Sequence, residues 1–394
     1  MNNRVEDCLI YLLKCVLNYR LPDYSALAVP MSDLYHLAKR HSVERMAFEA
    51  VKLIGAETIG QGNSRELRKN PNWNDEIFKK WQERCLVLET QSTIQQEECQ
   101  QIIQKFKDRE IKVLPLKGCI IKGMYPDPAY RQMGDIDLLI PGKMSELART
   151  IMEEMGYETE FFDERNNHDV YSKRPLMHVE LHRELFEQNN IFYSCYKNVW
   201  ESLKPVDKDS NEYMFSWEDF YLYMLAHFAK HYYDKGSGIR SVMDIYVFRK
   251  KYGDKLDRKY IAGELNRLGL TEFCHKVEKL AEEWFSDETQ GKMQRDDNME
   301  AVIFNSGVYG TYEQAMRNRL GNLMTKKTSL KMAKLKYMFS QVFVNYEGML
   351  LGYPILKKYP FLLPGCWIFR IFKVLLVKRD KVKKDWNTLK KIKE

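Results

Sequence analysis

The hydrophobic and polar positions of the chain follow two different periods, which place helical flanks around a centre rich in strands. Up to about residue 110, apolar side chains recur at helical spacing, most clearly over 75–109. Ser32 stands where its hydroxyl can accept from the first free N–H groups of a helix over 33–41. We therefore predict that the N-terminal region is helical.

Between residues 111 and 183 the pattern changes to short alternating segments. IKVLPL, DIDLLI and LMHVELHREL alternate in this way, and a helical pattern over 143–157 separates the second from the third. Such alternation over a few residues is typical of half-buried strands. This central part is therefore expected to contain a sheet.

After about residue 215 the helical period returns. Ser216 and Asp219 have the spacing of a capping box, in which a serine and an acid close the first turn of a helix. A Gly-Ser-Gly turn at 236–238 leads to a second helix over 239–253. The fold class predicted from these patterns is α+β.

Composition narrows the class of protein. The chain has 394 residues, of which 44% are hydrophobic, so it is long enough for two or three units with their own cores. It contains no run of about 18 apolar residues, and its first 20 residues do not resemble a signal peptide. Its eight cysteines are scattered without C-x-x-C spacing, which is typical of reduced thiols. We expect a cytoplasmic protein.

The net charge of +7 is unevenly distributed. Residues 314–394 contain 19 Lys and Arg against four acids, whereas the preceding residues contain 43 basic and 51 acidic side chains. A mildly acidic body therefore carries a basic tail. Such a tail predicts a polyanionic partner, either lipid headgroups, nucleic acid or an acidic protein surface.

The sharpest chemical signal is the segment Gly134-Asp135-Ile136-Asp137. Strand alternation places the side chains of Asp135 and Asp137 on one face and the neighbouring apolar side chains on the other. Two carboxylates about 4 Å apart repel each other by about 4 kcal/mol at an effective dielectric constant near 20. A hard cation such as Mg²⁺, which prefers carboxylate oxygens and phosphates, removes that cost.

A second strand supplies the complement. In Met177–His182 the polar residues His178, Glu180 and His182 alternate with apolar ones and share one face. If this strand pairs beside the Asp-x-Asp strand with polar faces aligned, Glu180 becomes a third carboxylate at the same site. Three carboxylates on adjacent strands suit two-metal phosphoryl or nucleotidyl transfer.

A turn upstream is suited to phosphate. Leu116-Lys117-Gly118 ends a strand and opens a helical segment, where free N–H groups can receive phosphate oxygens and Gly118 permits close approach. Lys117 adds a point charge, and Arg131 can reach the same anion with a bidentate fork. The alternative for Lys117 and Arg131 is an ordinary surface charge.

Taken together, LPLKG, the YP spacer with Arg131, GDIDLLI, the Gly-Tyr pair at 156–157 and VELH resemble the uncharacterised nucleotidyltransferase family of the DNA polymerase β-like superfamily. The resemblance implies a small mixed β-sheet with helices on one side, two Mg²⁺ ions and an NTP donor. On the matching positions it implies that Asp135, Asp137 and Glu180 are metal ligands and that Gly118 holds phosphate.

The resemblance extends more loosely to the flanks and has one departure. Residues 37–51 and the helical segments AHFAKHYYDKG and IRSVMDIYVF resemble the helical flanks of the family. The superfamily usually has Ser after the glycine of its turn, whereas Cys119 follows Gly118 here. The loss of that hydroxyl removes a phosphate contact, for which Lys117 can compensate.

Each of these residues also has a plainer interpretation. An Asp-x-Asp pair alone is common on exposed strands, and only its combination with the Lys-Gly turn and the Glu180 strand favours catalysis. His178 is expected on the solvent face. His182 either lies there too, or orients a carboxylate or binds nucleotide.

The helices after residue 215 hold further candidates on the substrate side. His227 and His231 lack the Glu of an H-E-x-x-H zinc motif, so helix packing or a polar lining of the cleft is expected. Arg240 and Asp244 are four residues apart and most simply form an intrahelical ion pair. Because the resemblance places this helix near the nucleotide, His231, Arg240 and Asp244 are candidate substrate-side residues.

The tail offers three alternatives. Residues 361–377 are strongly apolar but interrupted by Pro364, Arg370 and Lys373, and a lysine-rich extension follows. This arrangement resembles an interfacial helix on an anionic membrane surface, in a protein peripheral to the inner face of the membrane. A helix docked on the body is the second alternative. Nucleic acid is less favoured, because after residue 377 only Trp386 could stack on a base.

The sequence leads to one main hypothesis, an Mg²⁺-dependent nucleotidyltransferase that moves a nucleotidyl group from an NTP, by default ATP, to a hydroxyl or amine acceptor. The alternatives are a catalytically silent nucleotide-binding protein and a membrane-surface scaffold. We expect four parts: an N-terminal helical region (1–110), a nucleotidyltransferase core (111–205), a helical substrate-side domain (206–313) and a basic helical tail (314–394).

Overall fold

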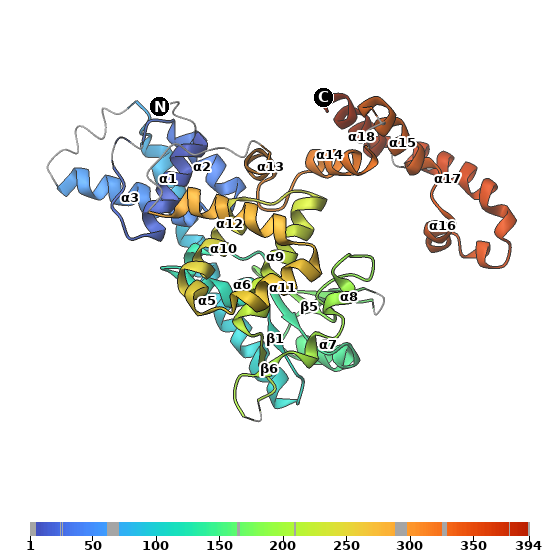
Figure 1. Ribbon diagram of the computed structural model, residues 1–394, viewed down its shortest axis with the longest axis horizontal. Helices are drawn as coiled ribbons and strands as arrows, with labels where there is room; N and C mark the ends of the chain where they lie inside the picture. The colour runs from blue at the N-terminus through green and yellow to red at the C-terminus, as the bar shows by residue number, and fades with distance from the viewer. Residues whose placement is uncertain are drawn as a thin grey trace. The chain divides into compact units, whose positions relative to one another are not determined.

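The computed structural model describes residues 5–23, 25, 27–60, 71–163, 166–208, 210–287, 298–324, 329–377 and 379–392. Its chain forms two compact units, drawn with their elements in Figure 1. The first unit comprises Met1–Ala229 and Gly238–Val308, and the second comprises Lys230–Ser237 and Tyr309–Glu394. Each unit is described by itself below.

A five-stranded sheet lies at the centre of the first unit. Its strand order is β1-β2-β5-β4-β3, and β2 and β5 run parallel while the other neighbours run antiparallel. The strands are β1 (Leu114–Pro115), β2 (Ile136–Leu139), β3 (Glu158–Phe161), β4 (His168–Lys173) and β5 (Met177–His182), and a separate two-stranded sheet pairs β6 (Lys204–Pro205) with β7 (Tyr213–Met214). The prediction of an α+β fold with a small mixed sheet is confirmed.

One face of the sheet is apolar and covered by helices. Ile136 and Leu138 on β2 and Val179 and Leu181 on β5 are fully buried there. They pack against side chains of α5 (Asp75–Asp108) and α7 (Ser145–Glu154). Because strand residues alternate between faces, the polar residues of β2 and β5 must point to the opposite face. The apolar face therefore fixes where the candidate site lies.

Helices make up most of the remainder of the first unit. They are α1 (Val5–Leu17), α2 (Met31–Arg40), α3 (Glu44–Gly60), α6 (Gly118–Ile121), α8 (Tyr193–Tyr196), α9 (Trp217–Asp234), α10 (Ile239–Tyr252), α11 (Arg258–Leu268), α12 (Thr271–Phe285) and α13 (Met299–Ser306), with 3₁₀ turns η2 (Lys122–Met124), η3 (Pro128–Tyr130), η4 (Gly142–Met144), η5 (Val199–Glu201) and η6 (Gly253–Lys255). The last turn and a half of α9 is assigned to the second unit.

The predicted helix caps have different outcomes. The capping box is confirmed, since Ser216 Oγ accepts from the Asp219 N–H and donates to the Asp219 carboxylate. The cap expected at Ser32 is wrong: α2 begins at Met31 after Pro30, and the Ser32 hydroxyl contacts Asp33 instead. Proline fixes its own φ near helical values, so the chain can enter the helix one residue before the expected cap.

The second unit consists of helices. They are α14 (Tyr312–Leu323), α15 (Leu330–Val342), α16 (Tyr346–Gly352), α17 (Leu363–Val377) and α18 (Arg379–Lys391), with η7 (Pro354–Lys357) and η8 (Pro360–Leu362). Leu320, Tyr337 and Leu389 belong to its small core. None of the helices that the structure describes combines the length and apolar character needed to cross a bilayer.

A buried ion pair joins the loop before β2 to α10. Arg131 is 8% exposed, and its Nε and Nη2 donate to the two carboxylate oxygens of Asp244 at 3.0 and 2.8 Å. The hydroxyl of Tyr125 donates to the same carboxylate at 2.7 Å. Such a bidentate pair is strong when both partners stay, and each partner becomes costly once the other is removed.

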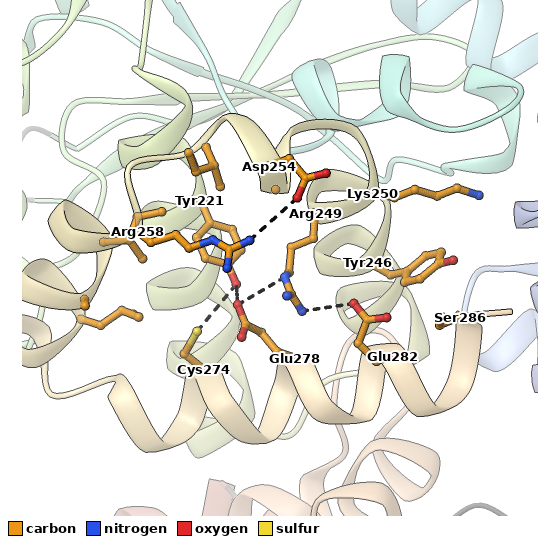
Figure 2. A pocket seen from close by; sticks show the side chains of 15 residues that line it. Tyr221, Tyr246, Arg249, Lys250, Asp254, Arg258, Cys274, Glu278, Glu282 and Ser286 are labelled. Carbon is orange, nitrogen blue, oxygen red and sulfur yellow. Dashed lines mark hydrogen bonds and ion pairs between the residues drawn. The ribbon is translucent and has the colours of Figure 1, made fainter. Parts of the chain in front are cut away.

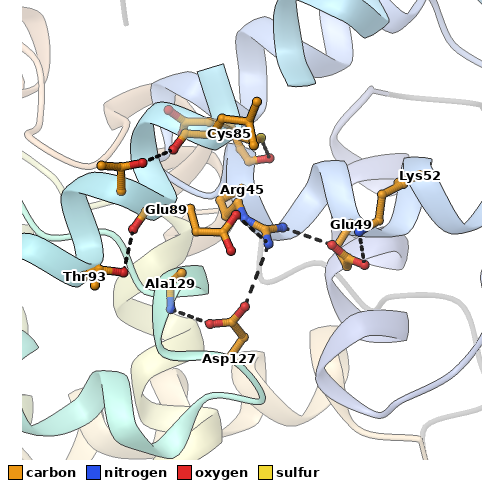
Figure 3. A network of polar contacts seen from close by, with 11 residues as sticks. Arg45, Glu49, Lys52, Cys85, Glu89, Thr93, Asp127 and Ala129 are labelled. Carbon is orange, nitrogen blue, oxygen red and sulfur yellow. Dashed lines mark hydrogen bonds and ion pairs between the residues drawn. The ribbon is translucent and has the colours of Figure 1, made fainter. Parts of the chain in front are cut away.

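A second buried arginine ties three further elements together, as Figure 3 shows. Arg45 on α3 lies 3.0 Å from Glu49, 3.6 Å from Glu89 on α5 and 3.8 Å from Asp127, which precedes η3. Its guanidinium also lies over the ring of Tyr130 at 5.2 Å. The N-terminal helices are thereby fixed to the loop that leads into β2.

We predict that Asp244→Asn destabilises the protein by about 3–5 kcal/mol, because it leaves the Arg131 guanidinium buried without a counter-charge. Chemical denaturation of the full chain measures the loss. The matched control is Glu264→Gln, which breaks the exposed Glu264–Arg267 pair on α11 and should cost no more than about 1 kcal/mol. Equal losses for the two variants would contradict a stabilising role for the buried pair.

Candidate functional site

Two acids face each other on the central pair of parallel strands. Asp137 on β2 is in register with Glu180 on β5, as the sequence predicted for aligned polar faces. Asp135 lies just before β2 and is half-buried. Burial raises the pKa of Asp135, and the charges of Glu180 and Asp137 raise it further. The three predicted acids therefore lie close enough to interact electrostatically.

The Asp137 carboxylate is held by two side chains, those of Lys117 and His182. Its Oδ1 accepts from Lys117 Nζ at 3.0 Å and from His182 Nε2 at 2.9 Å, and its side chain is 15% exposed. Burial opposes the charged form, but Lys117 and His182 outweigh it and hold the pKa of Asp137 well below its usual range. Asp137 is therefore an anion that the surrounding protein has already neutralised.

His182 bridges the two acids that face each other. Its Nε2 lies 2.9 Å from Asp137 and 3.3 Å from Glu180. Burial lowers the pKa of His182, but hydrogen bonds to the two carboxylates raise it overall, and the bond from His182 lowers the pKa of Glu180. Of the two sequence alternatives for His182, the geometry is that of a residue that orients carboxylates. His178 is exposed, as predicted.

The sequence patterns missed His168. It lies on β4, directly opposite His182 on β5, with the two imidazole rings 5.3 Å apart. Neither β3 nor β4 was predicted, although 168–173 alternates, with Asp169 and Tyr171 fully buried on one face. That alternation is the signal that could have found β4, but a buried aspartate obscures it. The charge of Asp169 is neutralised by Arg183, whose Nη2 lies 2.6 Å from Oδ1 of the aspartate.

The Lys-Gly turn lies between β1 and α6. Lys117 has φ 42°, a left-handed value that is uncommon for a residue other than glycine and is often found at functional sites. Among the described residues, no acceptor lies against the backbone N–H groups of Lys117 and Gly118. Two N–H groups thus stay available at the position where the sequence predicts phosphate.

Close packing explains why residue 118 is a glycine. A Cβ there would lie 2.6 Å from the Met133 sulfur and 3.2 Å from Nη1 of Arg131. The next residue, Cys119, directs its thiol to the backbone carbonyl of Asp137 at 3.7 Å. The turn is therefore packed directly against the strand that carries the two aspartates.

Arg131 and the substrate-side candidates differ from the simplest expectations. The fork of Arg131 contacts Asp244 in this structure, and its Nη1 donates to the carbonyl of Gln132. An intrahelical pair between Arg240 and Asp244 is the simplest expectation from the sequence; in the structure Asp244 pairs with Arg131, and Arg240 donates to that same Gln132 carbonyl. The buried bidentate pair between Arg131 and Asp244 is a stronger interaction than an i,i+4 pair on one helix.

Helix α9 contributes an aromatic side chain near the acids. Tyr223 is 1% exposed, and burial together with the charges of Asp137 and Glu180 raises its pKa well above the usual range. The ring of His227 lies 6.0 Å from that of Tyr223, which agrees with the packing expected for this histidine. His231 belongs to the second unit and is exposed.

Comparison with known proteins agrees with this geometry. A family model described as an uncharacterised nucleotidyltransferase matches residues 28–286, well over half of the chain. The chain belongs to this nucleotidyltransferase family. No curated protein matches it, and no solved structure does. The match covers the five-stranded sheet and the helices that pack around it, and it confirms the resemblance found in the sequence motifs.

The residues of this family member that could hold a metal fall into two overlapping sets. Asp135, Asp137 and Glu180 offer the oxygen ligands that Mg²⁺ prefers, so the chemistry of this set fits Mg²⁺. A second group of possible ligands among the described residues is a different one: one ligand atom each of His168, Glu180 and His182, all within 4.8 Å of one another. Glu180 belongs to both sets.

A cavity of about 580 Å³ lies between α9, α10, α11 and α12, away from the acids (Figure 2). Several of its charged groups are paired with one another. Arg249 lies 3.4 Å from Glu278 and 3.3 Å from Glu282, and the Tyr221 hydroxyl donates to Glu278. These pairs connect α10 and α9 to α12, so the polar lining of this cavity serves packing between helices.

We predict that Gly118→Ala destabilises the protein by about 1–3 kcal/mol, because the new methyl group overlaps Met133. Adding Met133→Ala removes the overlap, so the double variant should show a coupling energy of at least about 1 kcal/mol in denaturation. Gly123→Ala is the control, since nothing lies within 4 Å of a Cβ there. Simple additivity of Gly118→Ala and Met133→Ala would show that packing does not explain this glycine.

Proposed function

We propose that the protein is an Mg²⁺-dependent nucleotidyltransferase that moves a nucleotidyl group from an NTP, by default ATP, to a hydroxyl or amine acceptor. The observation that carries the proposal is the register of Asp137 with Glu180, beside Asp135, on the parallel strands of a chain in a nucleotidyltransferase family. Many exposed strands carry acids, but few bring three together against a low-dielectric interior.

In this proposal, Asp135, Asp137 and Glu180 hold two Mg²⁺ ions, which supply charge neutralisation for the triphosphate and activation of the acceptor oxygen or nitrogen. Glu180, partly exposed, is placed to receive a proton from the acceptor. His182 orients Asp137 and Glu180 through its hydrogen bonds to both. We propose that it also contacts the nucleotide.

The Lys117–Gly118 turn binds the triphosphate in this proposal. The unpartnered N–H groups of the turn are suited to phosphate oxygens. Lys117 adds a positive charge within reach of the same space, since its ammonium group already lies against Asp137. Metal cations bound to the acids would neutralise Asp137 in place of Lys117. The ammonium group of Lys117 would then be free to bind phosphate.

Arg131 is proposed to act through the position of the turn. A phosphate contact would require its fork to leave Asp244, with the loss of a buried bidentate pair. Its Nη1 instead lies beside Gly118, where it supports the turn. Arg240 and Asp244 are supporting residues in the same network.

We propose that the regions predicted from the sequence have different roles. Residues 111–205 carry the transfer chemistry, 206–313 cover the acceptor side, and 1–110 support the loop into β2. The proposed location is the cytoplasm. A silent nucleotide-binding protein is the competing function, and it would hold Mg²⁺–NTP without releasing pyrophosphate.

We predict that Asp137→Asn abolishes Mg²⁺-dependent NTP binding and lowers pyrophosphate release at least about 100-fold, since removing a metal ligand costs several kcal/mol of transition-state stabilisation. Binding is measured by calorimetry with each NTP, and release with cell extract as the acceptor. Glu158→Gln, at an exposed position of β3, is the control and should change neither.

Unchanged binding and release in Asp137→Asn would falsify the enzyme proposal. Binding by the wild-type protein that depends on Mg²⁺ and Asp137, without pyrophosphate release from any acceptor, would favour the silent alternative.

We also propose that the second unit binds an anionic membrane surface through residues 361–394. Ile368, Phe369 and Phe372 on α17 are about 60% exposed, and Phe372 lies three residues from Phe369 and four from Ile368, so the three share one side of the helix. Phe361, just before the helix, is 76% exposed. Apolar side chains on one helix beside a lysine-rich helix are typical of interfacial binding, where burial of the rings adds to attraction by acidic lipids.

We predict that Phe369→Asp combined with Phe372→Asp weakens binding of the full chain to vesicles of phosphatidylserine and phosphatidylcholine at least tenfold. Each ring contributes about 1.5–3 kcal/mol when buried in lipid. Flotation measures the bound fraction. Leu86→Asp combined with Val87→Asp, at exposed positions of α5, controls for the two added charges. Equal flotation of all three proteins, or binding of RNA oligonucleotides in preference to vesicles, would contradict a membrane surface as the partner.

A further inference from the structure

Two neighbouring strands place two histidines and a glutamate on one face of the sheet. His168 on β4 is the direct cross-strand neighbour of His182 on β5, and Glu180 precedes His182 by two residues on the same strand. Residues two apart on a strand point to the same face. The ligand atoms of these three side chains all lie within 4.8 Å of one another.

The spacing inside this group matches a coordination sphere. Nε2 of His182 and Oε2 of Glu180 are 3.3 Å apart. Two ligand atoms bound to one tetrahedral cation at about 2.0–2.1 Å are separated by about 3.3 Å. The third ligand, His168, closes the group with a side-chain adjustment of about 1.5 Å at most, from a separation of 4.8 Å or less to the tetrahedral separation of about 3.3 Å.

His182 also has a nitrogen that no hydrogen bond uses. Its side chain is more than nine-tenths buried, and Nδ1 has no partner among the described residues. A buried polar atom without a partner costs about 1–3 kcal/mol and calls for an explanation. The imidazole of His182 is therefore not fully satisfied by the protein groups around it.

The donor chemistry differs from that of the Asp135–Asp137 end. Two imidazoles and one carboxylate are the donor set of many zinc sites, and imidazole suits Zn²⁺ and similar transition-metal ions far better than Mg²⁺. Mg²⁺ keeps to oxygen ligands and to water. The group therefore selects for a class of cation that the proposed transfer reaction does not use.

We infer that His168, Glu180 and His182 form a binding site for a Zn²⁺-like divalent cation, separate from the proposed Mg²⁺ ligands except for the shared Glu180. Such a cation withdraws Glu180 from Asp135 and Asp137, so it opposes Mg²⁺. The opposition to Mg²⁺ rests on the proposed function, whereas the binding site itself does not.

The site is tested by titrating Co²⁺ into the Mg²⁺-free full-length protein and following its visible ligand-field absorption. The wild-type protein should bind one Co²⁺ at this site, and Zn²⁺ should displace it. His168→Asn should bind at least tenfold more weakly. Asp135→Asn, which removes an acid outside the group, should bind like wild type.

Three results would overturn the site. They are equal affinity of wild type and His168→Asn, an equal loss in Asp135→Asn, and a spectrum with the strong absorption of thiolate ligands. Because His168→Asn could disturb folding, a second measurement uses the wild-type protein alone. In a long-range ¹H–¹⁵N spectrum, Zn²⁺ should shift the ring nitrogens of two of the eight histidines. A spectrum without shifted histidines excludes the site.

The opposition to Mg²⁺ has its own readout. Zn²⁺ should inhibit pyrophosphate release by the wild-type protein at concentrations at least tenfold lower than for His168→Asn, and excess Mg²⁺ should relieve it. Co²⁺ binding without inhibition would keep the site and reject its effect on transfer. Co²⁺ binding by a protein that releases no pyrophosphate at all would reject the proposed function and leave the site standing.

Discussion

The parallel pairing of β2 with β5 is the constraint on which the rest of the site depends. It brings the carboxylates of Asp137 and Glu180 side by side over an apolar layer, where two like charges at about 4 Å repel by about 4 kcal/mol at an effective dielectric constant near 20. The chain relieves this repulsion with Lys117 and His182, both of which contact Asp137. A metal cation that enters the site would therefore replace the contacts that Lys117 and His182 make with Asp137.

Contacts around the acids hold the Lys117–Gly118 turn and the loop before β2 in place. The Lys117–Gly118 turn is fixed to β2 from two sides, by the Leu116 N–H that donates to the Asp137 carbonyl and by the Cys119 thiol that contacts the same oxygen. Arg131 then fixes the loop before β2 to Asp244 on α10. Cys119, at the position where the superfamily usually has a serine, directs its thiol to the strand backbone.

The sequence was most informative where a local pattern decides the structure. Alternation in β2 and β5 predicted which residues face the site, because a strand whose other face is buried can adopt only one register. The partner of Arg131 could not be predicted in this way. Asp244 is 113 residues away, and in the sequence it has a nearer candidate partner in Arg240. Likewise, His168 lies on a strand whose alternation contains the buried Asp169, so the pattern resembles a loop until Arg183 is known to pair with it.

The order of the strands also sets the order of the ligands. Across β2, β5 and β4 the polar face runs from Asp135 and Asp137, through Glu180, to His182 and His168, so oxygen donors lie at one end and nitrogen donors at the other. Glu180 belongs to both ends because β5 is the middle strand. A cation that prefers oxygen and one that prefers nitrogen therefore compete for one carboxylate, and His182, which bridges both ends, must release one acid to serve the other. Competition between the two classes of cation follows from the sheet order itself and needs no movement of the backbone.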